Sequence, residues 1–115
     1  MKNERKATDY LQDILYAIKK VDDFTSDLTY DQFVEDEKTQ FAVIRAIEVI
    51  GEAAKNIPDP VKNKHLSIPW RNITGMRDKL IHAYFGVDME ILWKAATIEV
   101  PGIEPKIRKI LDSLE

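Results

Sequence analysis

The sequence contains no cysteine, only two histidines and four glycines, and no long apolar run. Without cysteine there is no disulfide framework, no thiolate nucleophile and no zinc site built on thiolates. The two histidines, His65 and His82, are too few for a multi-histidine metal site within one chain, and we expect neither a metal nor another cofactor. No apolar stretch approaches the about 20 residues that span a bilayer. The first ten residues, MKNERKATDY, also lack the apolar segment of a secretion signal. We therefore expect a cytoplasmic protein with no membrane partner.

The remaining composition is that of an ordinary globular domain. The chain has 115 residues, of which 44% are hydrophobic and 32% are charged. This length and composition predict a single domain over residues 1–115. The chain has 17 Lys and Arg residues against 20 Asp and Glu, for a net charge of −3. Taken alone, this net charge predicts no nucleic-acid partner.

Apolar residues recur every three or four positions along the first half of the chain, which is typical of amphipathic helices. The first stripe runs from Ala7 to Val21, and a short helix is expected over residues 30–36. A long helix is then expected over about residues 38–56, ending before Pro58.

The long helix is apolar around most of its circumference, which predicts a central position in the fold. Its polar side carries Arg45, Glu48 and Glu52, at spacings of three and four. These three residues form either a solvated stripe or an internal polar network that supports the next helix.

The second half of the chain also predicts helices. A connector with a turn of helix at residues 60–64 precedes a helix that begins near Pro69 and ends at Phe85, with Gly86 as its cap. Asp88 is expected to cap a helix that meets a kink or break at Pro101 and Gly102, before a last amphipathic helix. No strand pattern is present. The predicted fold class is therefore all-α, an antiparallel helical bundle of about five helices around one core.

Charge is unevenly distributed along the sequence. Residues 61–85 contain five basic side chains and one acidic side chain, a local balance of +4, whereas the remainder carries a net −7. The positive segment also contains aromatic residues. Nucleic-acid binding uses basic side chains for the phosphates and aromatic side chains for stacking on the nucleobases. The charge distribution thus favours the nucleic-acid partner that the net charge does not predict.

Within this segment, Arg77 and His82 are five residues apart on the predicted helix. A metal-free ribonuclease needs a base for the 2′-hydroxyl, which histidine supplies near neutral pH, and a cation for the charge that develops on phosphorus, which arginine supplies. On a regular helix the two positions are about 140° apart. They therefore converge at the helix edge because arginine is long, or they meet across a two-fold axis in a second copy. Asp78 shares the face of His82. The alternative is that His82 is an ordinary capping or core histidine.

The segment PWRNITGMRDKLIHAYFGVDMEILWK resembles the HEPN superfamily, specifically the HepT-like toxins of MNT–HEPN toxin–antitoxin pairs. The family motif Arg-x4-His-x-Tyr is matched by Arg77, His82 and Tyr84. The block that contains Arg45, Glu48 and Glu52 also resembles this family. Asp78 is a variation, since these proteins often have asparagine after the arginine.

The resemblance implies a HEPN-like four-helix core, a homodimer and metal-independent endoribonuclease activity that leaves a 2′,3′-cyclic phosphate on RNA. In such a site, Arg77 would bind the scissile phosphate and His82 would take the 2′-hydroxyl proton, while Asp78 would orient the His82 ring. The resemblance also implies a partner, an MNT-type nucleotidyltransferase antitoxin that silences the toxin by attaching AMP to Tyr84.

Three further residues are candidates for RNA contact: Arg71, Lys79 and Trp70. For Trp70 the alternative is a packing role, and for Arg71 and Lys79 it is that of ordinary hydrated surface residues. Two other functions are compatible with the sequence. One is a non-catalytic HEPN module that binds nucleic acid or nucleotide, and the other is a subunit whose task is to bind the nucleotidyltransferase.

Overall fold

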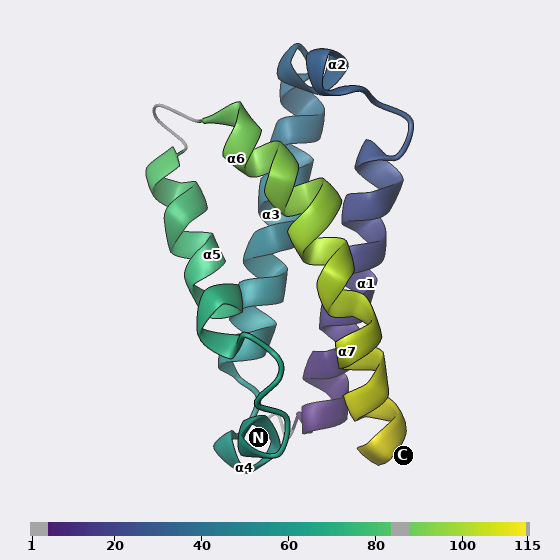
Figure 1. Cartoon of the computed structure of the whole chain (residues 1–115), viewed down its shortest axis with the longest axis vertical. Helices are drawn as coiled ribbons and strands as arrows, with labels where there is room; N and C mark the ends of the chain where they lie inside the picture. Colours follow the sequence, from purple (N-terminus) through teal and green to yellow (C-terminus); the bar gives the residue numbers. More distant parts are fainter. Residues whose placement is uncertain (1–4, 84–87, 115) are drawn as a thin grey trace.

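The computed structural model describes residues 5–83 and 88–114, and every regular element in these ranges is helical (Figure 1). Three of the elements, α6, η1 and α7, follow one another without a gap. The predicted all-α fold is confirmed. The elements are α1 (Ala7–Thr25), α2 (Tyr30–Val34), α3 (Glu37–Lys55), α4 (Asp59–Asn63), α5 (Trp70–Ala83), α6 (Met89–Lys94), the π-helical segment η1 (Ala95–Glu99) and α7 (Val100–Leu114).

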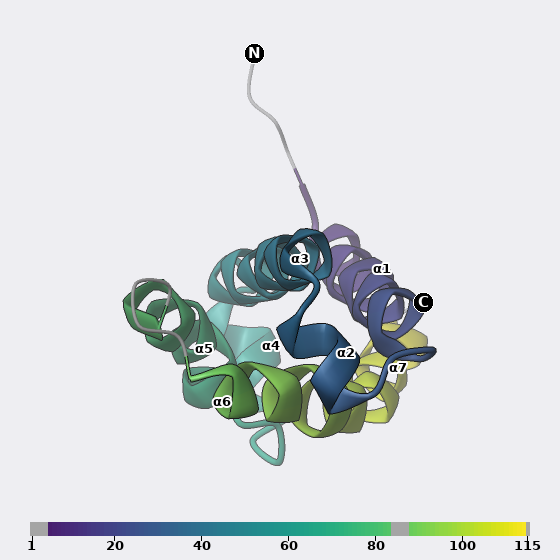
Figure 2. The same ribbon diagram turned by 90° about the horizontal axis from the view of Figure 1, so that it is seen from above.

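Four long helical segments, α1, α3, α5 and α6–η1–α7, run alternately up and down the molecule (Figure 1). Helix α3 packs against α1 on one side and against α5 on the other, and α1 also packs against α7. Seen from above, the four segments surround one core (Figure 2). Every long segment contributes to this core, whose largest fully buried side chains are Phe33, Leu11, Ile14, Ile47, Ile50, Ile73, Leu92, Ile107 and Ile110.

The junction between α2 and α3 is fixed by polar side chains. Asp36, the N-cap of α3, accepts hydrogen bonds from the Thr39 backbone N–H at 3.0 Å and from the Thr39 hydroxyl at 2.7 Å. The hydroxyl bond is the main reason why the pKa of the Asp36 carboxyl is lowered. The buried amide of Gln40 donates to the carbonyls of Phe33 and Val34, each at 2.9 Å. These bonds satisfy the last carbonyls of α2 and hold it on the end of the bundle.

The kink or break expected at Pro101 and Gly102 is not a break, because α7 begins at Val100 and continues through both residues. A proline removes one backbone donor and crowds the preceding turn of a helix. Here the preceding turn is the wider π-helical segment η1, in which the Val100 N–H donates to the carbonyl of Ala95, five residues earlier. The carbonyl of Trp93 accepts a bond from the Thr97 hydroxyl at 2.7 Å. The widened turn lets the helix accommodate the proline without ending.

The connector between α3 and α5 folds back at one end of the bundle, and α4 provides its turn of helix (Figure 1). Of the helices in the described ranges, none combines the length and the apolar character needed to cross a membrane.

Candidate active site

Helix α5 carries the candidate catalytic residues, and its first half is anchored in the core. The Ile73 backbone N–H donates to the carbonyl of Pro69 at 3.0 Å, and the indole N–H of Trp70 donates to the carbonyl of His65 at 3.1 Å. Trp70, Ile73 and Met76 are all buried, and α5 packs against α3. These contacts fix the axis and the rotation of α5, and therefore the positions of the residues that follow.

The register of α5 separates the two catalytic candidates. Each residue of an α-helix is rotated by about 100° from the one before it. The position of Arg77, four residues after buried Ile73, is on the side of the helix that faces the core. The position of His82, nine residues after Ile73, is on the opposite side, together with the exposed Asp78. The two candidates therefore occupy different faces of one helix.

The structure places some of the predicted site residues and leaves others outside its described part. Arg71 and Asp78 are exposed, whereas Trp70 is only 9% exposed and uses its N–H within the protein. The packing alternative for Trp70 accounts for this burial. The side chains of Arg77, Lys79 and His82, and all of Tyr84, lie outside the described residues. For Arg77, Lys79 and His82, the structure gives only their positions along α5.

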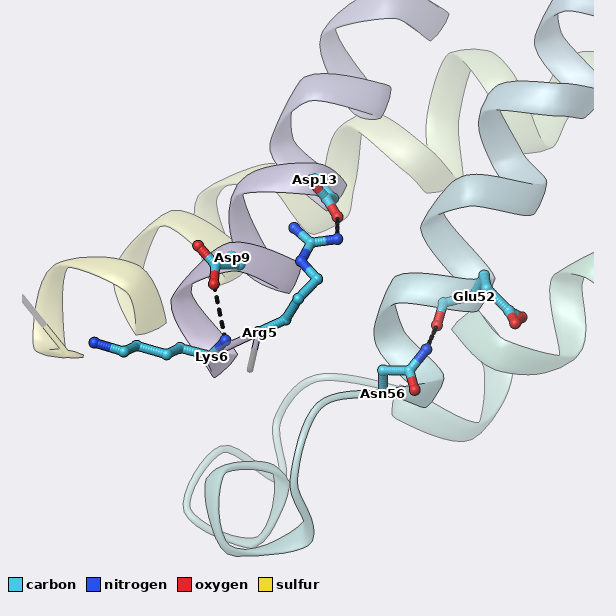
Figure 3. Close-up of polar contacts among 6 residues, drawn as sticks. All are labelled: Arg5, Lys6, Asp9, Asp13, Glu52 and Asn56. Carbon is cyan, nitrogen blue, oxygen red and sulfur yellow. Dashed lines mark hydrogen bonds and ion pairs between the residues drawn. The ribbon is translucent and has the colours of Figure 1, made fainter. Parts of the chain in front are cut away.

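In the polar line on α3, Arg45 and Glu52 are exposed and Glu48 is half-buried. Arg45 and Glu48 form an ion pair at 3.7 Å, and the Arg45 side chain is 76% exposed. Glu52 is exposed near the end of α3, where its backbone carbonyl accepts a bond from the Asn56 amide at 2.9 Å (Figure 3). Exposed pairs of this kind contribute about 0–1 kcal/mol to stability. Both interpretations of the polar line, a solvated stripe and a network that supports α5, stay predictions.

A groove beside α5 is the feature that the sequence did not reveal. It lies between α5 and the α6–η1–α7 segment and has a volume of about 660 Å³. Ile73 and Met76 line it from α5, and Ile91 and Ile98 line it from the other side. Ile91 and Ile98 are exposed, and they are seven residues apart. Periodicity cannot reveal this groove, because an exposed apolar residue continues the same pattern as a buried one.

Metal-ligating chemistry has no candidate in the described part of the chain, where no group of three or more histidine, aspartate or glutamate side chains is placed to hold an ion. Within two turns, the sequence of α5 instead carries the positions of Arg77, Asp78 and His82. This set can bind a phosphate and move a proton.

Comparison with known proteins gives consistent matches over nearly the whole chain. The family described as "Ribonuclease HepT-like" matches residues 14–110. The chain is 51% identical over 107 residues to a Thermococcus cleftensis protein named "Probable ribonuclease HepT", covering 93% of this chain and 97% of that protein. It is 47% identical over 106 residues to a candidate RNase of Methanocaldococcus jannaschii, covering 92% of this chain and 88% of that protein. A candidate RNase of Caldanaerobacter subterraneus is 40% identical over 102 residues, covering 89% of this chain and 91% of that protein. No solved structure matches the chain.

Proposed function

Because the chain belongs to the HepT-like ribonuclease family, we propose that it is an endoribonuclease that cuts RNA without a metal ion. The observation that carries the proposal is the presence of Arg77 and His82 on one helix, α5, whose first half is fixed in the core. These two residue types supply the two functions that such a reaction needs, a base and a phosphate-binding cation.

In the proposed reaction, His82 removes the proton from a ribose 2′-hydroxyl and the 2′-oxygen attacks the adjacent phosphorus. The bond from phosphorus to the 5′-oxygen breaks, that oxygen leaves as a 5′-hydroxyl by taking a proton from water, and the protonated His82 then returns its proton to the solvent. The products are a 2′,3′-cyclic phosphate and a 5′-hydroxyl end. Arg77 binds the phosphate oxygens, where negative charge develops in the transition state. Asp78, four residues before His82 and exposed, orients the imidazole ring as a positioning residue.

We further propose that the active form is a homodimer. Since the positions of Arg77 and His82 are about 140° apart around α5, one helix does not present both to the same side. A two-fold axis beside α5 brings two copies of the pair into one cleft, where Arg77 of one protomer meets His82 of the other. The cleft of one dimer then contains two equivalent Arg77–His82 pairs, each formed by one residue from either protomer.

Complementation between inactive variants tests this arrangement. Arg77→Ala and His82→Ala, each inactive alone, are co-expressed so that mixed dimers form. A mixed dimer keeps one of its two Arg77–His82 pairs intact. Since about half of the dimers are mixed, about a quarter of the wild-type cleavage rate is expected. If both residues act from the same protomer, the mixture stays inactive.

The matched control is wild-type protein co-expressed with the Arg77→Ala/His82→Ala double variant. With pairs formed between protomers, only the wild-type dimers are active, about a quarter of the total. With pairs formed within a protomer, about half of the activity remains. The two mixtures together therefore distinguish the alternatives without depending on the absolute rate of either variant.

We also propose a partner, an MNT-type nucleotidyltransferase antitoxin that attaches AMP to Tyr84. Tyr84 follows Arg77 by seven residues, a spacing that places two residues on the same side of a continuous helix. An AMP group adds a negative charge beside the phosphate-binding arginine, and it blocks RNA both electrostatically and sterically.

The substitution Tyr84→Phe should keep RNA cleavage and abolish silencing by the partner, because only the hydroxyl that accepts AMP is removed. Cleavage is measured before and after incubation with the nucleotidyltransferase and ATP, and AMP attachment is followed by mass spectrometry. Silencing of the Tyr84→Phe variant to the wild-type extent would exclude this role for Tyr84.

A further inference from the structure

The outer stripe of α5 consists of positions 71, 75, 78 and 82, occupied by Arg71, Gly75, Asp78 and His82. We infer that substrate RNA lies along this stripe, and that Arg71 binds a phosphate several nucleotides from the one that is cut. The inference rests on the proposed ribonuclease function and specifies how the same site holds its substrate.

The helical register aligns the two ends of the stripe. Arg71 and His82 are eleven residues apart, which is close to three full turns, so their positions differ by only about 20° around the axis. At a rise of about 1.5 Å per residue they are separated by about 16 Å along it. A stacked nucleic-acid strand covers that length with about five nucleotides, at about 3.4 Å each, and an extended strand with fewer.

Arg71 differs from the other arginines whose side chains are described. Arg5 pairs with Asp13 at 2.7 Å (Figure 3), Arg45 with Glu48 at 3.7 Å, and Arg108 with Glu104 at 2.6 Å. Arg71 is exposed and has no carboxylate within ion-pair distance among the described residues. Its guanidinium is therefore available for an anion, and a phosphate is the group that its two-pronged donor geometry fits.

Gly75 lies between the two ends of the stripe, and its packing against the described residues does not require glycine. A Cβ added at Gly75 would meet no atom within 4 Å in the described part of the chain. Glycine inside a helix lowers helix stability relative to alanine. A glycine with open space around it therefore leaves room for something outside the protomer to approach the helix backbone, and an RNA strand between Arg71 and His82 passes this position.

Further positive charge surrounds the Arg71 end of the stripe. The connector before α5 carries Lys62 and Lys64, and the Lys62 ammonium lies 5.9 Å from the centroid of the Trp70 ring at the start of α5. Lys106 reaches this end from α7, where its ammonium donates to the Ser67 carbonyl at 3.2 Å. One acidic residue of α4, Asp59, is also at this end. The excess of cations continues the path for the phosphate backbone beyond Arg71.

The stripe itself contains one carboxylate, that of Asp78, which does not favour a phosphate beside it. Asp78 is one turn before His82, and the proposed reaction already assigns it to the His82 ring. The stripe therefore binds phosphates at two places, at Arg71 and at the reaction site. The RNA strand between them passes the uncharged Gly75.

The first experiment measures how the effect of Arg71→Ala depends on RNA length. The probes are 2′-O-methyl RNA oligonucleotides, which bind without being cut, extended by about six nucleotides on the 5′ or the 3′ side of a central phosphodiester. Arg71→Ala should weaken binding of one of the two extended probes about tenfold. It should also lower the slope of log Kd against log salt concentration by about one. Cleavage of a dinucleotide, which cannot reach Arg71, should keep its wild-type rate.

The control for this experiment is Arg108→Ala, which removes an arginine on the far side of the bundle and should leave RNA binding unchanged. Wild-type affinity of Arg71→Ala for both extended probes would overturn the inference. An equal loss for the dinucleotide would do so as well, because it would show that Arg71 acts on folding or on the reaction site. Because binding is measured without cleavage, a wild-type protein that binds the probes but cuts no RNA refutes the proposed function separately.

The second experiment compares Gly75→Ala with Gly102→Ala. Gly102, in α7, also has open space at its Cβ, so both variants should fold and should have a raised Tm from the gain in helix propensity. Only Gly75→Ala should weaken binding of the extended probe. If Gly75→Ala instead shifts the dimer–monomer equilibrium, measured by light scattering, and leaves the RNA affinity unchanged, the open space belongs to a second copy and the inference is wrong.

Discussion

Replacing His82 by alanine should lower the rate of RNA cleavage by about 10²- to 10⁴-fold, the contribution typical of a positioned general base. An imidazole is the side-chain type suited to removing a proton near neutral pH, and alanine provides no substitute. Arg77→Ala leaves the base in place and should lower the rate by a comparable factor, about 10²- to 10³-fold, through loss of charge stabilisation in the transition state.

The chain offers a matched control, since its only other histidine is His65. His65 lies in the connector before α5, and its backbone carbonyl accepts the Trp70 indole bond at 3.1 Å and the Ile68 N–H bond at 3.2 Å. His65→Ala keeps that carbonyl and should keep the wild-type cleavage rate. Initial rates on a fluorescent RNA give both values, and similar rates for the two histidine variants would exclude the role of His82.

Replacing Phe33 by alanine should destabilise the protein by about 3–5 kcal/mol, the usual cost of removing a buried aromatic ring. Phe33 is fully buried, and its ring centroid is 5.0 Å from that of Trp93. It is the buried residue of the five-residue helix α2, which is too short to be stable alone. Total stabilities of small domains are about 5–15 kcal/mol, so this loss is a large fraction of the total.

The expected change is measured by urea unfolding, with Phe24→Ala as the control. Phe24 is 37% exposed near the end of α1, so its truncation should have a much smaller effect on the free energy of unfolding. Both variants lose a phenylalanine ring, so the difference between their free energies of unfolding reports the effect of burying Phe33. Equal losses would mean that α2 does not stabilise this end of the bundle.

The helical part of the fold could be predicted from the sequence because helix periodicity is a local property. The stripe from Ala7 to Val21 became the buried face of α1, and the wide apolar arc of α3 matches its position between two neighbours. Asp88 caps α6 as expected, accepting bonds from the N–H groups of Glu90 and Ile91. In each case the residues that form the pattern also form the contacts.

The continuation of α7 through Pro101 could not be predicted in the same way. Proline shows where a helix loses a hydrogen bond, but the π-helical widening that compensates depends on the preceding turn and on the packing around it. The groove beside α5 cannot be predicted from the sequence for a related reason. It arises from the position of α5 relative to α6–η1–α7, a tertiary property that local periodicity does not encode.

For the candidate site, the sequence supplied the residue types and their spacing, and the structure added the orientation of α5. The burial of Trp70 removes most of its ring from contact with a ligand, whereas Arg71, the next residue, is exposed and unpaired among the described residues. Composition cannot separate these neighbours, because the rotation of a helix about its axis is set by its packing. The open space at Gly75 is likewise a property of the folded helix.

The most direct test of the central claim, a metal-independent ribonuclease, is cleavage of RNA by the purified protein with a chelator in excess and with the product ends mapped. We predict that cleavage continues in the chelator and leaves 2′,3′-cyclic phosphate and 5′-hydroxyl ends. Cleavage that stops in the chelator and returns with an added divalent ion would contradict this claim. So would products with 3′-hydroxyl and 5′-phosphate ends, because attack by the 2′-oxygen cannot produce them.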